Sequence, residues 1–322
     1  MSNMREYAIS DFKVDENIAF LVCASFESRC TAIASHLSKD KVVKAYVFAP
    51  DNEIEQRKQH QEHLMQLFTD KALLVELEFN NPFSYSVKFY KVVSELIENK
   101  INHIMIDIST FTHEMLLILL KILSGKKDNF NQIELVYLSA AGYSIGDKDE
   151  HKWLSKGCKE VRSVLGFPGI ILPNKPICLI LLVGFEHERA LALINDMDPD
   201  VLYMGYGMTA SQHIMSEAHV APMTFFERLH SGLLSSREGV FDFAFSVKDI
   251  EDTVEKIKEK IIETPHCNHI VVPLNTKTST IAAGIVALQD QSIQLCYAEP
   301  ELYNVDNYSL PGDKLISFNL EI

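Results

Sequence analysis

Two stretches of the chain, FLVCASFESR (Phe20–Arg29) and ILLVGFEHER (Ile180–Arg189), carry the same features in the same order. Each is an apolar run that ends in a small residue and continues with Phe-Glu and then Arg. The Phe-Glu pairs begin at Phe26 and Phe185, 159 residues apart. A short apolar run bounded by a turn is typical of a buried strand. The pair therefore indicates two copies of one strand-loop-helix unit.

Two further matches follow in the same order along the chain. The run NHIMIDISTFT (102–112) corresponds to NHIVVPLNTKT (268–278), and IELVYLSAAGY (133–143) corresponds to IQLCYAEPELY (293–303). Their offsets are 166 and 160 residues. A period this long indicates domain duplication, because solenoid repeats span only about 20–50 residues.

Short apolar runs alternate with amphipathic ones in both copies, as in the expected strand Ile177–Val183 and the expected helix 250–262, which predicts βαβ units and mainly parallel sheets. We therefore expect an α/β protein with two tandem Rossmann-like parallel-sheet domains related by internal duplication. The expected domains are residues 1–143 and 177–322. Residues 144–176 are expected to form an ordered connecting segment with a short helix, because Trp153, Val161 and Phe167 lie among its glycines and prolines.

Composition narrows the classes of function. The 322 residues carry a net charge of −14, which argues against a broad nucleic-acid surface, since phosphate contacts need clustered Lys and Arg. The first 17 residues lack the apolar core of a signal peptide, and the six cysteines form no CxxC pair. We expect a cytoplasmic protein without a membrane span.

The residues that follow the first and fourth strands of each copy are the first candidates for a ligand site. In parallel sheets ligands bind beyond the carboxyl ends of the strands, where loops and helix starts offer N–H groups. The candidate ligand-binding residues are Ser25, Phe26, Arg29, Ser109, Thr110, Thr112, His113, Gly184, Phe185, Arg189, Asn275, Thr276, Lys277 and Thr278.

Helix capping is the alternative for these hydroxyls. Ser and Thr are preferred at helix N-caps, so Thr110 and Thr278 are candidate caps. One helix start needs one cap, however, and each cluster holds additional hydroxyls together with His113 or Lys277.

The run Ile106–Met115, IDISTFTHEM, resembles the Asp-x-Thr-Gly-Gly-Thr-Lys signature after the fourth strand of CARF domains, which are Rossmann-like sensors of cyclic oligonucleotides. SAVED domains resemble two such units in one chain. The resemblance implies ligand contacts for Ser25, Phe26, Ser109, Thr110, Thr112 and His113. The sequence departs from the signature at Thr110-Phe111, which replaces the Gly pair, and at His113, which replaces the Lys.

Catalysis is a second hypothesis for the same loops. The candidate catalytic residues are His113, Lys277, Glu27 and Glu186, with arginines beside the two carboxylates. Such pairs are more often structural ion pairs. His60 and His63, three residues apart, lack a clear third metal ligand, so we expect them on a solvated helix face. Neither GxGxxG nor GxxxxGK[ST] is present, so no nucleotide cofactor is expected.

Three functions remain open at this point. The first is a sensor that binds a nucleotide-type ligand in a cleft between its halves and signals to a protein effector, as in antiviral defence. The second is an enzyme that cleaves a nucleotide, such as a phosphodiesterase, a ring nuclease or a nucleoside hydrolase. The third is a non-catalytic scaffold subunit of a defence complex.

Overall fold

The computed structural model describes residues 4–143, 153–185, 187–208, 226–227, 229–234 and 236–321. They form two compact α/β units. Unit 1 runs from Met1 to Ile145 and also includes Ser309–Ile322, and unit 2 runs from Gly146 to Tyr308.

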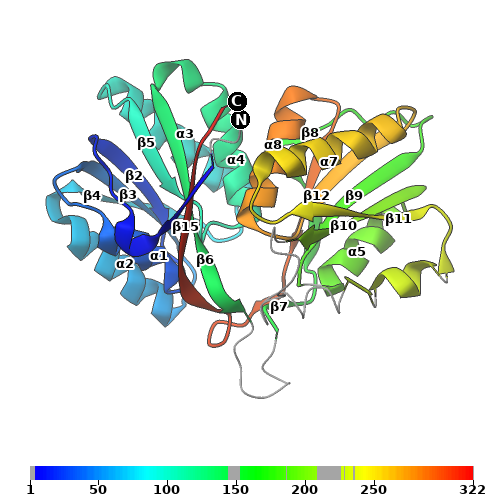
Figure 1. Ribbon diagram of the computed structural model, residues 1–322, viewed down its shortest axis with the longest axis horizontal. Coiled ribbons are helices and arrows are strands. Elements are labelled where there is room, and N and C mark those ends of the chain that lie inside the picture. The colour runs from blue at the N-terminus through cyan, green and yellow to red at the C-terminus, as the bar shows by residue number, and fades with distance from the viewer. Residues whose placement is uncertain are drawn as a thin grey trace. The chain divides into compact units, whose positions relative to one another are not determined.

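Unit 1 contains a seven-stranded sheet in the order β1-β15-β6-β5-β2-β3-β4 (Figure 1). The five strands from β6 to β4 are parallel, and β15 and β1 continue the sheet in antiparallel pairs. The strands are β1 (Arg5–Ala8), β2 (Ile18–Cys23), β3 (Val42–Pro50), β4 (Ala72–Leu77), β5 (His103–Asp107), β6 (Gln132–Tyr143) and β15 (Ser309–Asn319).

Helices cover both faces of this sheet (Figure 1). They are α1 (Arg29–His36) and α2 (Glu55–Phe68) on one face, and α3 (Pro82–Glu98) and α4 (His113–Ser124) on the other. Short 3-10 turns are η1 (Ile9–Asp11), η2 (Thr69–Lys71) and η3 (Lys127–Asn129). Asn81 caps α3 by accepting hydrogen bonds from the N–H groups of Phe83 and Ser84, and Pro82 opens the helix. The central strand β2 is buried along its whole length.

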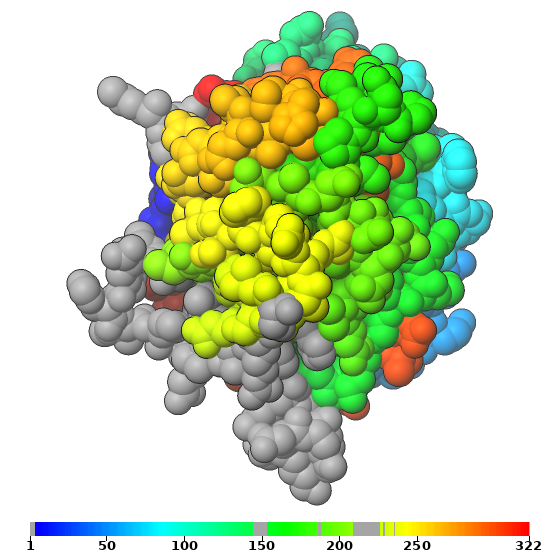
Figure 2. Space-filling view, turned by 90° about the vertical axis from the view of Figure 1, so that its right-hand side faces the viewer, coloured from blue at the N-terminus to red at the C-terminus, as the bar shows by residue number. Residues whose placement is uncertain are grey.

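Unit 2 contains a six-stranded sheet in the order β11-β10-β9-β12-β13-β8 and a separate β14-β7 pair. The strands are β7 (Ser155–Lys156), β8 (Glu160–Pro168), β9 (Ile177–Val183), β10 (Val201–Met208), β11 (Val240–Ser246), β12 (Asn268–Pro273), β13 (Gln294–Glu299) and β14 (Leu302–Tyr303). The helices are α5 (His187–Met197), α7 (Ile250–Glu263) and α8 (Lys277–Gln289). In Figure 2, which shows one face of unit 2, the yellow-to-orange helix α7 lies at the surface.

The two sheets share one strand order, which confirms the predicted pair of Rossmann-like domains. The parallel core of unit 1 is β6-β5-β2-β3-β4, and that of unit 2 is β13-β12-β9-β10-β11. If the five parallel strands of each copy are numbered in chain order, both sheets have the strand order 5-4-1-2-3. The first and fourth strands, which carry the quoted repeats, are therefore neighbours in each unit.

The C-terminal boundary differs from the expected one. We expected residues 177–322 to form one domain, but β15 belongs to the sheet of unit 1, where it pairs with β6 over Ser309–Asn319. Its counterpart β8 follows β6 in the chain and pairs with β13 of unit 2. The strand β15 follows the fifth strand of copy 2 and joins the sheet of copy 1. The strand β8 follows the fifth strand of copy 1 and joins the sheet of copy 2.

The connecting segment also differs from the prediction. The described part of residues 144–176 contains β7 and β8 instead of a short helix. Gly166 has φ +93° within β8, a conformation that favours glycine and interrupts a helix, and the register of β8 with β13 is irregular there. The open edge of β13 supplies the backbone partners for β8, and this long-range pairing overrides the local apolar spacing.

Candidate functional site

The predicted loops lie at the same place in both sheets. Ligands bind open parallel sheets where neighbouring strands send their connections to opposite faces. In unit 1 this point lies between β2 and β5, and in unit 2 between β9 and β12. The loops after these four strands contain the candidate ligand-binding residues, so the candidate site of each unit is the carboxyl edge at this switch point.

Glu27 and Arg29 form a buried ion pair beside this edge in unit 1. Arg29 Nη2 lies 2.6 Å from Glu27 Oε2, and the two residues are only 2% and 9% exposed. Arg29 Nη1 also donates to the carbonyl of Leu138, and Ser309 Oγ donates to Glu27 Oε2 over 2.6 Å. Two further contacts place the guanidinium near the rings of Tyr137 and Tyr143.

Burial alone would lower the pKa of Arg29, but the Glu27 carboxylate and the phenol oxygens of Tyr143 and Tyr137 outweigh it. The pKa of the guanidinium is therefore raised, and Arg29 stays charged. Glu27 and Arg29 thus have a structural role inside unit 1, whatever they contribute to a ligand.

The loop after β5 uses most of its hydroxyls to hold the unit together. Ser109 Oγ accepts from the N–H of Leu138 over 2.9 Å, and Thr110 Oγ1 donates to the carbonyl of Cys23 over 2.7 Å. Thr112 is the N-cap of α4 and accepts from the N–H of Met115. The cap is therefore Thr112, and the predicted capping role of Thr110 is wrong.

Asp107, the last residue of β5, is fully buried. One carboxyl oxygen accepts from the N–H of Ser109 over 2.9 Å, and the other has no hydrogen-bond partner among the described residues. Burial raises the pKa of Asp107 to about 7, although Ser109 and the nearby Arg29 act in the opposite direction. A carboxyl group at the switch point therefore titrates near neutral pH.

The loop after β12 is built in a similar way in unit 2. Asn275 Nδ2 donates to the carbonyl of Val183 over 2.5 Å, and this bond joins β12 to β9 as Thr110 joins β5 to β2. Thr276 is the N-cap of α8 and accepts from the N–H of Ser279. Thr278 donates to the carbonyl of Val247 over 2.6 Å, so its predicted capping role is also wrong.

The caps correct the expected register between the copies. The sequence repeat aligned 107–112 with 273–278, which places Thr112 on Thr278. The structure makes Thr112 and Thr276 the equivalent N-caps, and His113 and Lys277 the equivalent first residues of α4 and α8. The loop of unit 2 is two residues shorter, and the repeat of the strand alone does not reveal this. Both copies therefore place Thr followed by a basic residue at the helix start.

The partly exposed candidates are fewer than the predicted ones. Ser25, Phe26, Thr112 and His113 in unit 1 and Phe185, Asn275, Thr276 and Lys277 in unit 2 are neither fully buried nor fully exposed. Glu186 lies outside the described residues. Because they are partly exposed, these candidate side chains are accessible at the edges of the two sheets without any unfolding of the protein.

Gly184 is required by the backbone packing of unit 2. A Cβ atom at this position would lie 2.1 Å from the carbonyl oxygen of Leu274. We expect Gly184→Ala to lower the free energy of unfolding by about 1–3 kcal/mol, the usual cost of overpacking. Urea unfolding followed by Trp153 fluorescence will measure this. Gly232→Ala is the control, because nothing lies within 4 Å of the added Cβ.

Unit 2 has its own buried cluster, which sequence analysis missed in part. Arg189 lies 5.5 Å from the ring of Tyr297, as Arg29 lies near Tyr137 in unit 1. Arg162 approaches the same ring at 5.4 Å and pairs with Glu299 at 2.5 Å. Burial would raise the pKa of Glu299, but Arg162 and Lys159 outweigh it and the pKa is lowered. The alignment of Tyr137 with Tyr297 in the sequence repeat is the signal from which this cluster could have been inferred.

Three residues from the β3-α2 segment also lie at the carboxyl edge of unit 1. His60 Nδ1 is 2.7 Å from the carbonyl oxygen of Ser25, and Arg57 Nε donates to the carbonyl of Asn52. Arg57 is 6% exposed. Sequence spacing had placed His60 on a solvated helix face, because a contact with a loop 35 residues away leaves no local pattern.

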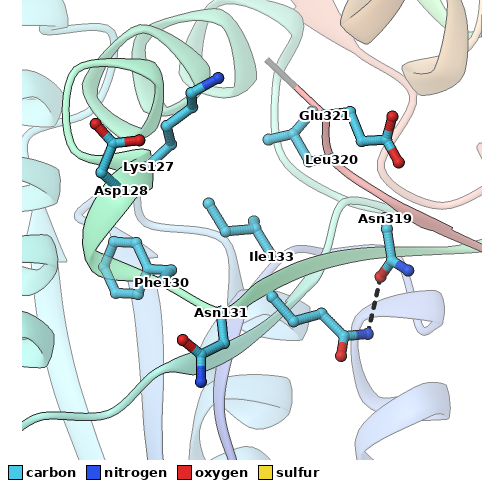
Figure 3. Close-up of a pocket in the computed structure, with 9 residues that line it drawn as sticks. Lys127, Asp128, Phe130, Asn131, Ile133, Asn319, Leu320 and Glu321 are labelled. Atoms are coloured by element: carbon cyan, nitrogen blue, oxygen red, sulfur yellow. Dashed lines mark hydrogen bonds between the residues drawn. The ribbon is translucent and has the colours of Figure 1, made fainter.

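A pocket of 620 Å³ lies at the opposite end of the unit 1 sheet, where β6 begins and β15 ends (Figure 3). Its lining residues include Phe130, Asn131 and Leu320, and Gln132 donates to Asn319 across it. None of the predicted site residues lines this pocket. Among the described residues, no group of three or more His, Cys, Asp or Glu side chains could hold a metal ion. In the same part of the chain, no helix is both long and apolar enough to cross a bilayer.

No family model and no curated protein matches the chain. Solved structures that resemble it include Can2 from Sulfobacillus thermosulfidooxidans in complex with cyclic tetra-adenylate, at 13% identity and a TM-score of 0.30, with 42% of this chain and 37% of that chain covered. A ketoreductase from a macrolactin assembly line has 10% identity and a TM-score of 0.24, with 90% and 71% covered. UDP-GlcNAc 2-epimerase from Neisseria meningitidis has 10% identity and a TM-score of 0.25, with 80% and 77% covered. The strand order itself establishes the chain as an α/β protein of two Rossmann-like units.

Proposed function

We propose that the protein recognises a phosphate-containing nucleotide at the switch-point edges of its two sheets. The observation that carries the proposal is the repeated pair of a Thr N-cap and a basic residue, Thr112-His113 and Thr276-Lys277, at the start of equivalent helices. Helix N-termini attract anions through their N–H groups and the helix dipole.

Helix stability gives no reason for a basic residue at this position. A positive charge in the first turn opposes the helix dipole by about 0.3–1 kcal/mol. The first turn of α8 contains Lys277 and no acidic residue. A bound phosphate would offset this cost, because it lies between the cation and the helix terminus.

Phe26 and Phe185 supply the second element of the proposal. They occupy equivalent positions after β2 and β9, and both are partly exposed. Bases stack on aromatic side chains in a sequence-tolerant way. The finer proposal of a cyclic oligonucleotide ligand, and of a role in defence through a protein effector, comes from the resemblance of Ile106–Met115 to the CARF signature.

We expect Lys277→Ala and His113→Ala each to weaken nucleotide binding by about 1.5–3 kcal/mol, the range for a hydrogen bond to a charged group. The free energy of unfolding without ligand should change by no more than about 1 kcal/mol, the size of the helix-dipole effect of one charge. Lys258→Ala, an exposed lysine on α7 of the same unit, is the matched control and should bind as the wild type does.

Thermal melts of these variants with cyclic di-, tri- and tetranucleotides will measure the effect, since a ligand that binds only the folded state raises the melting temperature. Mass spectrometry of small molecules released from the purified protein identifies a ligand that is already bound. Calorimetric stoichiometry separates one shared ligand per chain from one per unit. If no nucleotide is released and none shifts the wild-type melt, the proposal is wrong.

The same mixtures test the enzyme alternative. New nucleotide products after incubation, lost in His113→Ala, would show that the chain cleaves its ligand. An unchanged nucleotide together with a shifted melt supports recognition without cleavage.

A further inference from the structure

Helix α3 has two apolar faces. Its inner face buries Tyr85, Phe89, Val92, Val93 and Leu96 against unit 1. Its outer face exposes Phe83, Val87 and Tyr90 by 71%, 64% and 52%. The outer face continues through the partly buried Ser94 and Ile97.

The outer residues have the spacing of a helix-pairing seam. From Phe83 to Ile97 the steps along the chain are four, three, four and three residues. Apolar residues at alternating steps of three and four form the stripe along which two helices pack as a coiled coil. The inner face already satisfies the packing of unit 1, so folding of the unit does not account for the outer stripe.

The charged residues beside the stripe have opposite signs, so those of one helix can pair with those of an identical helix. Lys91 and Glu98 each follow a seam residue, Tyr90 and Ile97, and both are exposed. They therefore lie on the same flank of the stripe, seven residues or about two turns apart along α3. In an antiparallel pair of identical helices, this flank of one helix lies beside the same flank of the other, in the reverse direction.

We propose that α3 is a homodimer interface, in which it packs antiparallel against α3 of a second copy of this chain. In this register Val87 lies opposite the partner's Ile97, and the large Tyr90 lies opposite the partner's small Ser94. Lys91 then reaches the partner's Glu98, because side chains point towards the N-terminus of their own helix and the two approach each other. Because the dimer has two-fold symmetry, this ion pair forms twice.

Lys126 is the neighbour that must accommodate the partner. Its Nζ lies 5.5 Å from the centre of the Tyr90 ring. Lys126 follows the end of α4, and its long side chain can keep its charge in water while the ring packs against Ser94 of the other helix.

The small size of the interface determines the affinity that we expect for the dimer. A helix of 17 residues is about 25 Å long. A single helix pair of that length lies at or below the small end of specific interfaces, and such contacts are weak or transient. We therefore expect a reversible dimer that forms at roughly micromolar concentration.

Sedimentation velocity over a dilution series of the full chain tests the proposal. The wild type should shift from monomer to dimer with rising concentration, and Val87→Asp should remain monomeric up to about 100 μM, since a charge in the seam opposes pairing. Lys88→Gln, exposed on α3 but outside the seam, should behave as the wild type does. Unchanged far-UV circular dichroism will show that Val87→Asp, at a largely exposed position, is folded.

Charge reversal tests the antiparallel register itself. Lys91→Glu and Glu98→Lys should each weaken self-association by about tenfold or more, because each replaces two attractive pairs with two repulsive ones. An equimolar mixture of the two variants should form a heterodimer in which both pairs are attractive again. A wild type that stays monomeric at about 100 μM overturns the proposal. A dimer that is unaffected by Val87→Asp, or a mixture that shows no recovery, overturns it as well.

Discussion

Replacement of Arg29 by alanine is expected to lower the free energy of unfolding of unit 1 by about 3–5 kcal/mol, the cost of leaving one partner of a buried ion pair alone. Glu27 is 9% exposed, and without the guanidinium its carboxylate keeps only the hydroxyl of Ser309 and local contacts. The loss should be this large because the pair is inside the unit, where water cannot replace the missing charge.

Hydrogen exchange of the unit 1 amides is the suitable measurement, because the single tryptophan, Trp153, reports on unit 2. Lys58→Ala is the matched control. It removes the exposed Glu53–Lys58 pair of the same unit, and surface pairs contribute only about 0–1 kcal/mol. The double variant Glu27→Gln, Arg29→Met should recover much of the loss, since it leaves no buried charge. A loss below about 1 kcal/mol for Arg29→Ala would contradict the structural role assigned to the pair.

Asp107 should make unit 1 less stable as the pH rises. Burial raises the pKa of its carboxyl group from the ordinary 3.8 to about 7 in the folded state, so the folded state holds the proton more tightly than the unfolded state does. The stability contributed by the protonated Asp107 carboxyl group is fully present below pH 3.8, its ordinary pKa in the unfolded state. This contribution is lost between about pH 4 and pH 7, and the difference of about three pKa units corresponds to as much as about 4 kcal/mol.

Asp107→Asn removes the titrating group and retains an oxygen that can accept from the Ser109 N–H. Compared with the wild type, it should be more stable at pH 8, and most of the difference should disappear near pH 4. Hydrogen exchange and thermal melts at both values will measure the effect. Glu76→Gln, an exposed carboxylate on the edge strand β4, is the control and should keep the wild-type dependence. Equal pH dependence in Asp107→Asn and the wild type would show that the carboxyl group is ionised in the folded protein.

The strands and the duplication could be predicted from sequence because their signals are local. Predicted runs such as Ile177–Val183 coincide with a strand, and Ile250–Ile262 lies within α7. Buried parallel strands are nearly continuous apolar runs, and covering helices repeat their apolar residues every three or four positions. The repeated Phe-Glu and Asn-His-Ile segments then fixed the equivalence of the first and fourth strands.

The roles of individual site residues could not be read in the same way. Thr110 and Thr112 both follow β5, yet one bonds to Cys23, 87 residues away, and the other caps α4. The two hydroxyls are chemically alike, and only the position of the neighbouring strand separates their roles. The equivalence of His113 and Lys277 likewise depends on where each helix begins, which differs by two residues between the copies.

By itself the sequence determined the fold class and the two-fold repeat, because both follow from periodicity within short segments. Only the tertiary structure decided that β15 completes the sheet of unit 1 and β8 that of unit 2. Antiparallel partners so far apart in the chain are selected by the open edge they complete. The structure also decided that Glu27, paired with Arg29, accepts a hydrogen bond from Ser309, a contact across 282 residues that no local pattern encodes.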